Sequence, residues 1–158
     1  MSAQEQGHTY KVSALEHGTV IDHLRGGTAL QALRALALPK NTTVTVGINL
    51  LSKRLGHKDI IKIEGYETTT DEAAKVALIS PDATLSIIRD YKVAEKVGLH
   101  PPETFRGLIR CVNPMCIVHK ERVEGAFVVE AGDPVVVRCE YCERQIQVEQ
   151  LEFESRLS

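Results

Sequence analysis

The stretches CVNPMC, residues 111–116, and CEYC, residues 139–142, contain all four cysteines of the chain. Their spacing is C-x4-C-x22-C-x2-C, so the thiols form two tight pairs in the last third of the sequence. Three kinds of site have clustered cysteines of this kind: a disulfide framework, a redox dithiol and a four-thiolate metal site. The residues around the cysteines distinguish between them.

The second pair lies between residues 135–137 and 146–148, two Val/Ile-containing runs that predict short strands. A redox C-x-x-C normally begins a helix, whereas a strand-turn-strand knuckle aims both sulfurs at one point. Two knuckles supply the tetrahedral set that a structural zinc ion prefers. The sequence therefore predicts one structural Zn²⁺ per chain, bound by Cys111, Cys116, Cys139 and Cys142.

Four thiolates leave no open coordination position, so we expect this metal to stabilise a fold and not to catalyse a reaction. His119, three residues after Cys116, is expected to be an exposed strand residue outside the ligand set. The sequence also has no Gly-rich phosphate loop and no recognisable nucleophile-base motif. We therefore expect a protein that is not an enzyme by itself.

Composition excludes several other classes. The 158 residues contain 19 Lys plus Arg against 21 Asp plus Glu, and only 4% are aromatic, which argues against a nucleic-acid partner. No apolar run approaches the ~20 residues of a membrane span, so we expect no membrane partner. Residues 1–7 are polar and predict no secretion signal, which favours a cytoplasmic location where thiols stay reduced. Residues 1–9 are predicted to form a disordered tail.

A domain boundary is indicated by GLHPPETF, residues 98–105. Pro101 and Pro102 cannot continue a helix or occupy a central strand, so they predict a stiff connector. We expect one domain over residues 1–102 and a second over residues 103–158. The second is so short that a metal ion would contribute much of its folding free energy.

The first domain alternates between two periodicities. Residues 43–50, TVTVGINL, place Val44, Val46, Ile48 and Leu50 on one face of a half-buried strand. Further strands are predicted at residues 11–15, 19–24, 59–64 and 84–88. Helices are predicted at 28–38, with Leu30, Leu33 and Ala37 on one side, and at 69–80, where Thr69 and Glu72 form a capping-box pattern.

This order predicts an α+β protein: an N-terminal ferredoxin-like βαββαβ domain with both helices on one face of the sheet, followed by a small all-β, zinc-ribbon-like domain. The other face of the sheet would then be available for a ligand.

Specific motifs add a family resemblance. GTVIDHL at 18–24, KDIIKIE at 58–64 and YKVAEK at 91–96, followed by the cysteine pattern, together resemble the regulatory chain of aspartate carbamoyltransferase. The resemblance extends from about residue 10 to about residue 150. It implies a noncatalytic allosteric subunit of de novo pyrimidine biosynthesis that binds nucleotide effectors, CTP and ATP with UTP as a third candidate.

The resemblance also implies roles for individual residues. Lys62 and Lys96 suit the phosphates, Asp22 can accept hydrogen bonds from ribose hydroxyls, and His23 can reach a phosphate when protonated. Base reading by backbone groups maps to Val12, Ala14 and Leu15, with Tyr91 and Val93 opposite.

Partners follow from the same resemblance. The zinc domain would dock on the catalytic chain, with Asn113, Tyr141 and Glu143 as candidate docking residues. Regulatory chains would pair as dimers, with the strand at 44–50 as a plausible contact, and would bridge catalytic trimers in a dodecamer. Two alternatives from other classes are a free-standing nucleotide sensor and a zinc-ribbon protein that binds nucleic acid.

Overall fold

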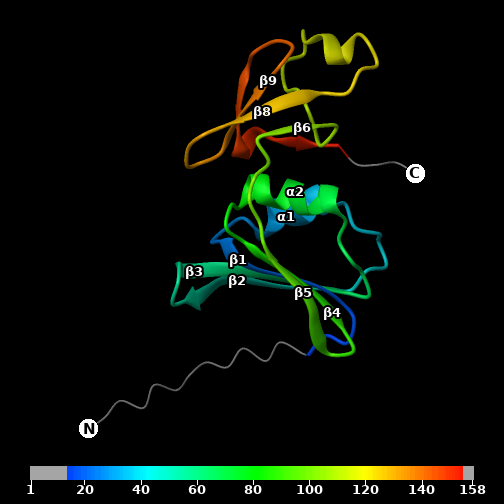
Figure 1. The fold of residues 1–158 in the computed structure, drawn as a ribbon, viewed down its shortest axis with the longest axis vertical. Coiled ribbons are helices and arrows are strands. Elements are labelled where there is room, and N and C mark those ends of the chain that lie inside the picture. Colours follow the sequence, from blue (N-terminus) through cyan, green and yellow to red (C-terminus); the bar gives the residue numbers. More distant parts are fainter. Residues whose placement is uncertain (1–13, 155–158) are drawn as a thin grey trace.

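The computed structural model describes residues 14–154. Two bodies are stacked along its long axis, and two helices lie between a larger sheet and a smaller β domain (Figure 1). Both helices cover the same face of the larger sheet, and the opposite face carries no helix. The prediction of an α+β fold is confirmed.

The N-terminal body contains β1 (Gly18–Arg25), α1 (Ala29–Leu36), β2 (Val44–Ser52), β3 (Gly56–Glu64), α2 (Thr70–Ile79), β4 (Thr84–Arg89) and β5 (Lys92–Gly98). Its strands are antiparallel in the order β2-β3-β1-β4-β5. The first four strands and two helices form the predicted βαββαβ arrangement. The fifth strand, β5, was not predicted, and every one of its residues is exposed.

The C-terminal body contains β6 (Thr104–Arg106), β7 (Ile109–Arg110), η1 (Ile117–His119), β8 (Ala126–Glu130), β9 (Val136–Cys139), β10 (Gln145–Gln147), η2 (Val148–Gln150) and β11 (Glu152–Phe153). One sheet has the order β10-β9-β8-β6, and β7 pairs with β11. The strand predicted at 146–148 ends one residue early, because Val148 begins a 3-10 turn.

The capping box of α2 is confirmed. Thr69 Oγ1 accepts from the Glu72 N–H at 3.2 Å, and the Glu72 carboxylate accepts from the Thr69 N–H at 2.8 Å. These two bonds satisfy backbone donors that have no partner inside the helix. They set the start of α2 and hence the face that it presents to each body.

The side of α1 that carries Leu30, Leu33 and Ala37 is not its main buried side, although Leu33 packs against the core. Leu30 is 56% exposed and Ala37 is a left-handed C-cap, whereas the buried side consists of Ala29, Ala32, Ala35 and Leu36. Alanines permit closer approach between α1 and its neighbours than leucines would. The apolar pattern alone could not distinguish the two faces, because both are rich in Ala and Leu.

Two strand predictions also need correction. The alternation of β2 fails after Val46, because the register shifts between Gly47 and Leu50, and Ile48 is 50% exposed. Of the strand predicted at 11–15, Ala14 and Leu15 lie in no strand, and the rest is outside the described residues, like the tail predicted at 1–9.

Each of the two bodies contributes side chains to the hydrophobic core of the other. Leu78 of α2 is fully buried in the C-terminal core, and Val148 is buried in the N-terminal core. Leu151 and Phe153 pack against both cores. The small domain is therefore stabilised partly by α2. Neither helix of residues 14–154 is long and apolar enough to cross a membrane.

Candidate metal centre and sheet face

The four cysteine sulfurs lie within 4.8 Å of one another. Cys111 Sγ is 3.6 Å from Cys142 Sγ, and Cys116 Sγ is 3.8 Å from Cys139 Sγ. A disulfide would need about 2.05 Å, whereas a tetrahedral zinc ion with Zn–S bonds of about 2.3 Å holds its sulfurs about 3.8 Å apart. This geometry suits a structural zinc, and the ion would be enclosed because three of the four cysteines are buried.

The thiols differ in acidity. Burial raises the pKa of Cys111 and of Cys139. Burial also acts to raise the pKa of Cys142, but the Arg144 N–H and the Asn113 side chain outweigh it and lower that pKa to about 7. Metal ligands must be thiolates, so a dication would compensate for burying these groups as anions.

His119 lies in the turn η1, not in a strand as predicted. Its Nδ1 accepts from Arg110 Nε at 3.1 Å, since an arginine can only donate. Its Nε2 therefore donates to the carbonyl oxygen of Cys111 at 2.7 Å. Both ring nitrogens are thus occupied, and the histidine supports the first knuckle without being a ligand.

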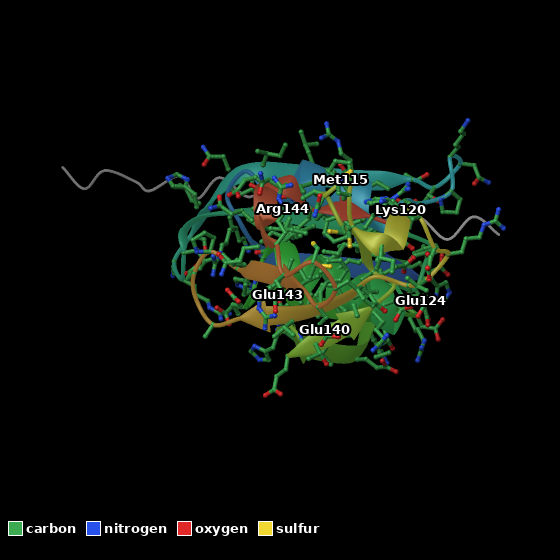
Figure 2. The ribbon with its side chains drawn as sticks, turned by 90° about the horizontal axis from the view of Figure 1, so that it is seen from above. Met115, Lys120, Glu124, Glu140, Glu143 and Arg144 are labelled. Atoms are coloured by element: carbon green, nitrogen blue, oxygen red, sulfur yellow. The ribbon has the colours of Figure 1, made fainter. Side chains whose placement is uncertain are left out.

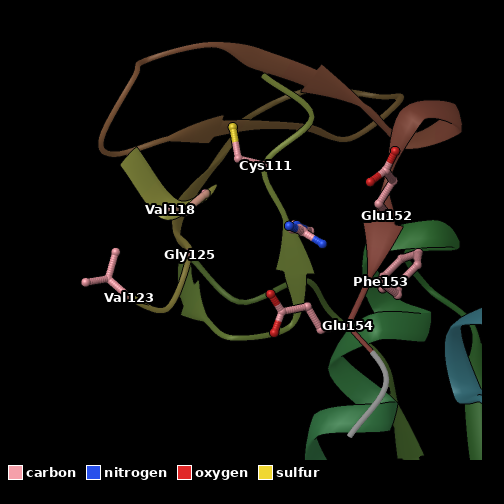
Figure 3. Close-up of a pocket in the computed structure, with 8 residues that line it drawn as sticks. Cys111, Val118, Val123, Gly125, Glu152, Phe153 and Glu154 are labelled. Atoms are coloured by element: carbon pink, nitrogen blue, oxygen red, sulfur yellow. The ribbon is translucent and has the colours of Figure 1, made fainter. Parts of the chain in front are cut away.

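A hollow of about 480 Å³ lies beside this network (Figure 3). The residues that line it are Arg110, Cys111, Val118, Val123, Gly125, Glu152, Phe153 and Glu154. Three of them are charged, one positively and two negatively. Glu152 faces Arg110 across the β7–β11 pair. A surface with a guanidinium between carboxylates has no preference for an anionic nucleotide.

The three predicted docking residues lie around the knuckles. Tyr141 and Glu143 are exposed in the turn after Cys139, but the Asn113 side chain bonds within its own loop, accepting from the Met115 N–H at 3.0 Å. Figure 2 looks down on this end and shows Glu143 and Arg144 on one side, with Lys120 and Glu124 on the other. The end of the molecule is therefore strongly charged.

Lys62 and Lys96 share the helix-free face of the larger sheet. Strand pairing aligns one residue from each strand in a row, from β2 to β5: Thr45, Lys62, Val20, Ser86 and Lys96. Residues directly opposite in an antiparallel sheet point to the same side. Three strand spacings of about 4.8 Å separate the two lysines, so their backbones are about 14 Å apart. Long side chains can close on a ligand between them.

Asp22 and His23 lie at a bulge of β1. The strand loses register between Ile21 and Leu24, and His23 has a φ of 56°. Asp22 Oδ1 lies 2.7 Å from Lys58 Nζ and accepts from the His23 N–H at 2.6 Å, and His23 Nδ1 is 3.1 Å from Thr84 Oγ1. These contacts leave Oδ2 of Asp22 to accept from a ligand. Lys58, which was not predicted, adds a third cation.

The residues predicted to read a base lie at the other end of the face. The Tyr91 N–H donates to the Glu16 carbonyl at 3.1 Å, so the 14–16 segment lies beside the β4–β5 turn. Tyr91 and Val93 are exposed, and Leu15 is buried. Ala14 and Leu15 also line a hollow of about 650 Å³, which none of the three lysines lines. Val12 lies outside the described residues.

Replacing Lys58 with alanine is expected to raise the pKa of Asp22. Burial pushes that pKa upward, but the hydrogen bond from Lys58 and its charge hold it below the ordinary 3.8. In the parent, the pair therefore stabilises the fold above pH ~4 and stops doing so as the pH falls through the lowered pKa. A carboxyl-carbon NMR titration measures the shift. Lys62→Ala is the control, and an unchanged Asp22 pKa in Lys58→Ala would contradict the assignment.

A buried carboxylate, also not predicted, connects this face to the rest of the domain. Asp59 is completely buried, and accepts from the Gly27 and Ala29 N–H groups at 3.0 Å and from the Asn49 N–H at 2.9 Å. It therefore caps α1, whose own N-cap, Thr28, makes no side-chain cap. It also fixes the β2 bulge, next to Lys58.

Comparison with known proteins agrees with this architecture. The family model for the aspartate carbamoyltransferase regulatory chain, allosteric domain, matches residues 10–100, and that for its metal binding domain matches residues 103–152. The chain is 49% identical to the aspartate carbamoyltransferase regulatory chain of Methanopyrus kandleri over 89% of this chain and 92% of the relative. It is 46% identical to that of Methanocaldococcus jannaschii, covering 85% and 90%, and 45% to that of Pyrococcus abyssi, covering 89% and 95%.

Two domain matches in this order, together with relatives matched over most of their length, show the family. The prediction of a noncatalytic chain is confirmed by the same relatives, all of which are regulatory chains. The chain therefore belongs to the aspartate carbamoyltransferase regulatory chain family, with an N-terminal allosteric domain and a C-terminal metal-binding domain whose four cysteines suit a structural zinc.

Proposed function

We propose that this chain binds nucleoside triphosphates on the helix-free face of its larger sheet and passes their occupancy to a catalytic chain of aspartate carbamoyltransferase. The observation that carries the proposal is the row that places Lys62 and Lys96 on one face, with Val20 and Ser86 between them. Within residues 14–154, no helix covers this face, and the two lysines are far enough apart for a triphosphate to bind between them. CTP, ATP and UTP are the candidate effectors.

The proposed site has three parts. Lys62, Lys96 and Lys58 would bind phosphates, assisted by His23 when it is protonated. Asp22 would accept from the ribose through its remaining oxygen. Backbone groups of Val12, Ala14 and Leu15, with Tyr91 and Val93 opposite, would read the base.

The metal-binding domain would supply the contact with the partner. We assign Cys111, Cys116, Cys139 and Cys142 as ligands of one Zn²⁺ per chain, and we divide the domains between residues 102 and 103. Tyr141 and Glu143, exposed after the second knuckle, would contact the catalytic chain, with Asn113 shaping the first knuckle beside them.

The assembly we propose is a regulatory dimer that bridges catalytic trimers in a dodecamer. β2 is an edge strand of the larger sheet, and Ile48 and Leu51 on it are 50% and 70% exposed. An exposed apolar edge strand is suited to pairing with a second copy. A cytoplasmic location belongs to this proposal, because a reducing compartment keeps the four thiols available.

Lys62→Ala and Lys96→Ala are each expected to weaken nucleotide binding about 10- to 150-fold, because each removes a charge-assisted contact of about 1.5–3 kcal/mol. Isothermal calorimetry with the regulatory chain and CTP or ATP measures the loss. Lys120→Ala, an exposed lysine of the metal-binding domain, is the control and should bind like the parent. Both variants binding both nucleotides like the parent would refute this site.

The two alternatives from the sequence are less favoured. A free-standing sensor would bind nucleotide without a catalytic chain, and a nucleic-acid binder would show salt-dependent affinity for DNA or RNA. Co-purification with a catalytic chain from cells that express both separates these readings, because neither alternative requires that partner.

A further inference from the structure

Arg25, the last residue of β1, contacts both bodies. Its backbone N–H donates to Ser80 Oγ at 2.9 Å, and Ser80 is the completely buried C-cap of α2. Its guanidinium forms an ion pair with Asp133, 108 positions away in the loop between β8 and β9. Figure 1 shows that loop reaching toward the end of β1. One residue therefore connects the larger sheet, α2 and the metal-binding domain.

Arg25 follows the bulge that carries the proposed effector residues. Asp22 and His23 precede it by three and two positions, and the bulge is closed by the Asp22 carboxylate, which accepts from the His23 N–H and pairs with Lys58. A phosphate that binds Lys58 would compete with the pair that Lys58 makes with Asp22. Loss of that pair would alter the bulge between Ile21 and Leu24, which immediately precedes Arg25.

The other contacts between the bodies are of a different kind. Leu78 and Val148 are buried, Gln31 Nε2 donates to the Val148 carbonyl at 2.6 Å, and Lys75 Nζ donates to the Glu154 carbonyl at 2.6 Å. These contacts hold the bodies together. The Arg25 and Asp133 side chains are 35% and 68% exposed, so their pair adds little to stability and can open without unfolding.

We propose that Arg25 and Asp133 form an interdomain latch through which nucleotide occupancy at the β1 bulge is passed to the β8–β9 hairpin, and so to the knuckle that begins at Cys139. The hairpin is continuous with that knuckle, because β9 ends at Cys139. This inference rests on the proposed function and adds the route of the signal. A ligand shifts a conformational balance only through contacts that differ between its states, and the latch is such a contact.

The test uses holoenzyme assembled from the regulatory and catalytic chains. Arg25→Ala and Asp133→Ala are each expected to reduce the nucleotide-induced change in catalytic activity about two- to fivefold, the range of an exposed ion pair. The charge swap Arg25→Asp with Asp133→Arg is expected to restore part of the response. Holoenzyme assembly by size-exclusion chromatography is expected to stay like the parent, and the nucleotide affinity of the isolated regulatory chain is expected to change by no more than about the same two- to fivefold, because coupling is reciprocal.

Arg138→Ala is the matched control. Arg138 is also 35% exposed and is ion-paired at 3.0 Å, but with Glu130 of the same hairpin, and its loss should leave the response intact. If the parent holoenzyme responds to nucleotide and Arg25→Ala responds equally, the latch is refuted while the proposed function stands. If the parent chain binds no nucleotide in calorimetry, the proposed function fails, and the latch fails with it. Equal losses in Arg138→Ala and Arg25→Ala would also overturn the latch.

Discussion

Cys139→Ala is expected to abolish zinc binding and to unfold the metal-binding domain, while the N-terminal sheet keeps its nucleotide affinity. Apparent binding energies for four-ligand structural zinc are about 10–16 kcal/mol, which matches or exceeds the whole stability of a typical domain. Cys139 is completely buried, and its sulfur is 3.8 Å from that of Cys116. Holoenzyme assembly should therefore be lost, and removal of the metal by a chelator should have the same effect.

Three measurements check this expectation. Metal analysis should give one zinc per parent chain and much less in the variant, circular dichroism should report the lost β structure, and size-exclusion chromatography with the catalytic chain should show no complex. Met115→Ala is the matched control for zinc content and folding, since Met115 lies in the first knuckle but is 70% exposed. Active parent holoenzyme with much less than one zinc per regulatory chain would contradict the assignment.

Asp59→Ala is expected to lower the free energy of unfolding of the N-terminal domain by about 3–5 kcal/mol. The substitution leaves the buried N–H of Ala29 without its acceptor, which costs about 1–3 kcal/mol. It also removes the part-buried hydrogen bonds of the Gly27 and Asn49 N–H groups to a charged acceptor, which add to this loss. Asp59→Asn keeps the size of the side chain and should have a smaller effect, because one of its two terminal groups remains an acceptor.

Urea unfolding at fixed zinc and protein concentration measures the difference, since ligand and subunit concentrations both shift apparent stability. Glu64→Ala removes an exposed carboxylate from the end of the same strand and is expected to change stability by less than about 0.5 kcal/mol. If Asp59→Ala proved as mild as Glu64→Ala, the three hydrogen bonds would not be holding α1 and the β2 bulge in place.

The sequence predicts features that depend on local chemistry. The cysteine spacing is enough to indicate the metal site, and Thr69 with Glu72 is enough to set the start of α2. Asp59 was missed although a signal was present. In KDIIKIE it shares the alternation of Ile61 and Ile63, which are completely buried, so the pattern places a charge on the buried face.

The remaining features depend on packing that no single segment encodes. β5 has no buried face, since the helices do not cover it, and so it has no alternating pattern. The ion pair of Asp22 with Lys58 requires the β1–β3 register, and the pair of Arg25 with Asp133 requires the two bodies to be docked. Such contacts between distant positions follow from the assembled fold and not from periodicity.

The exchange of side chains between the two cores limits how these domains can be recombined. A chimaera that joins the N-terminal half of one relative to the C-terminal half of another at Pro101 and Pro102 would divide the sequence at its natural connector. It would nevertheless pack Leu78 from one parent into the C-terminal core of the other, and residue 148 of the second parent into the N-terminal core of the first. A stable chimaera therefore needs α2 and the C-terminal segment from the same parent, although the connector lies between them in the sequence.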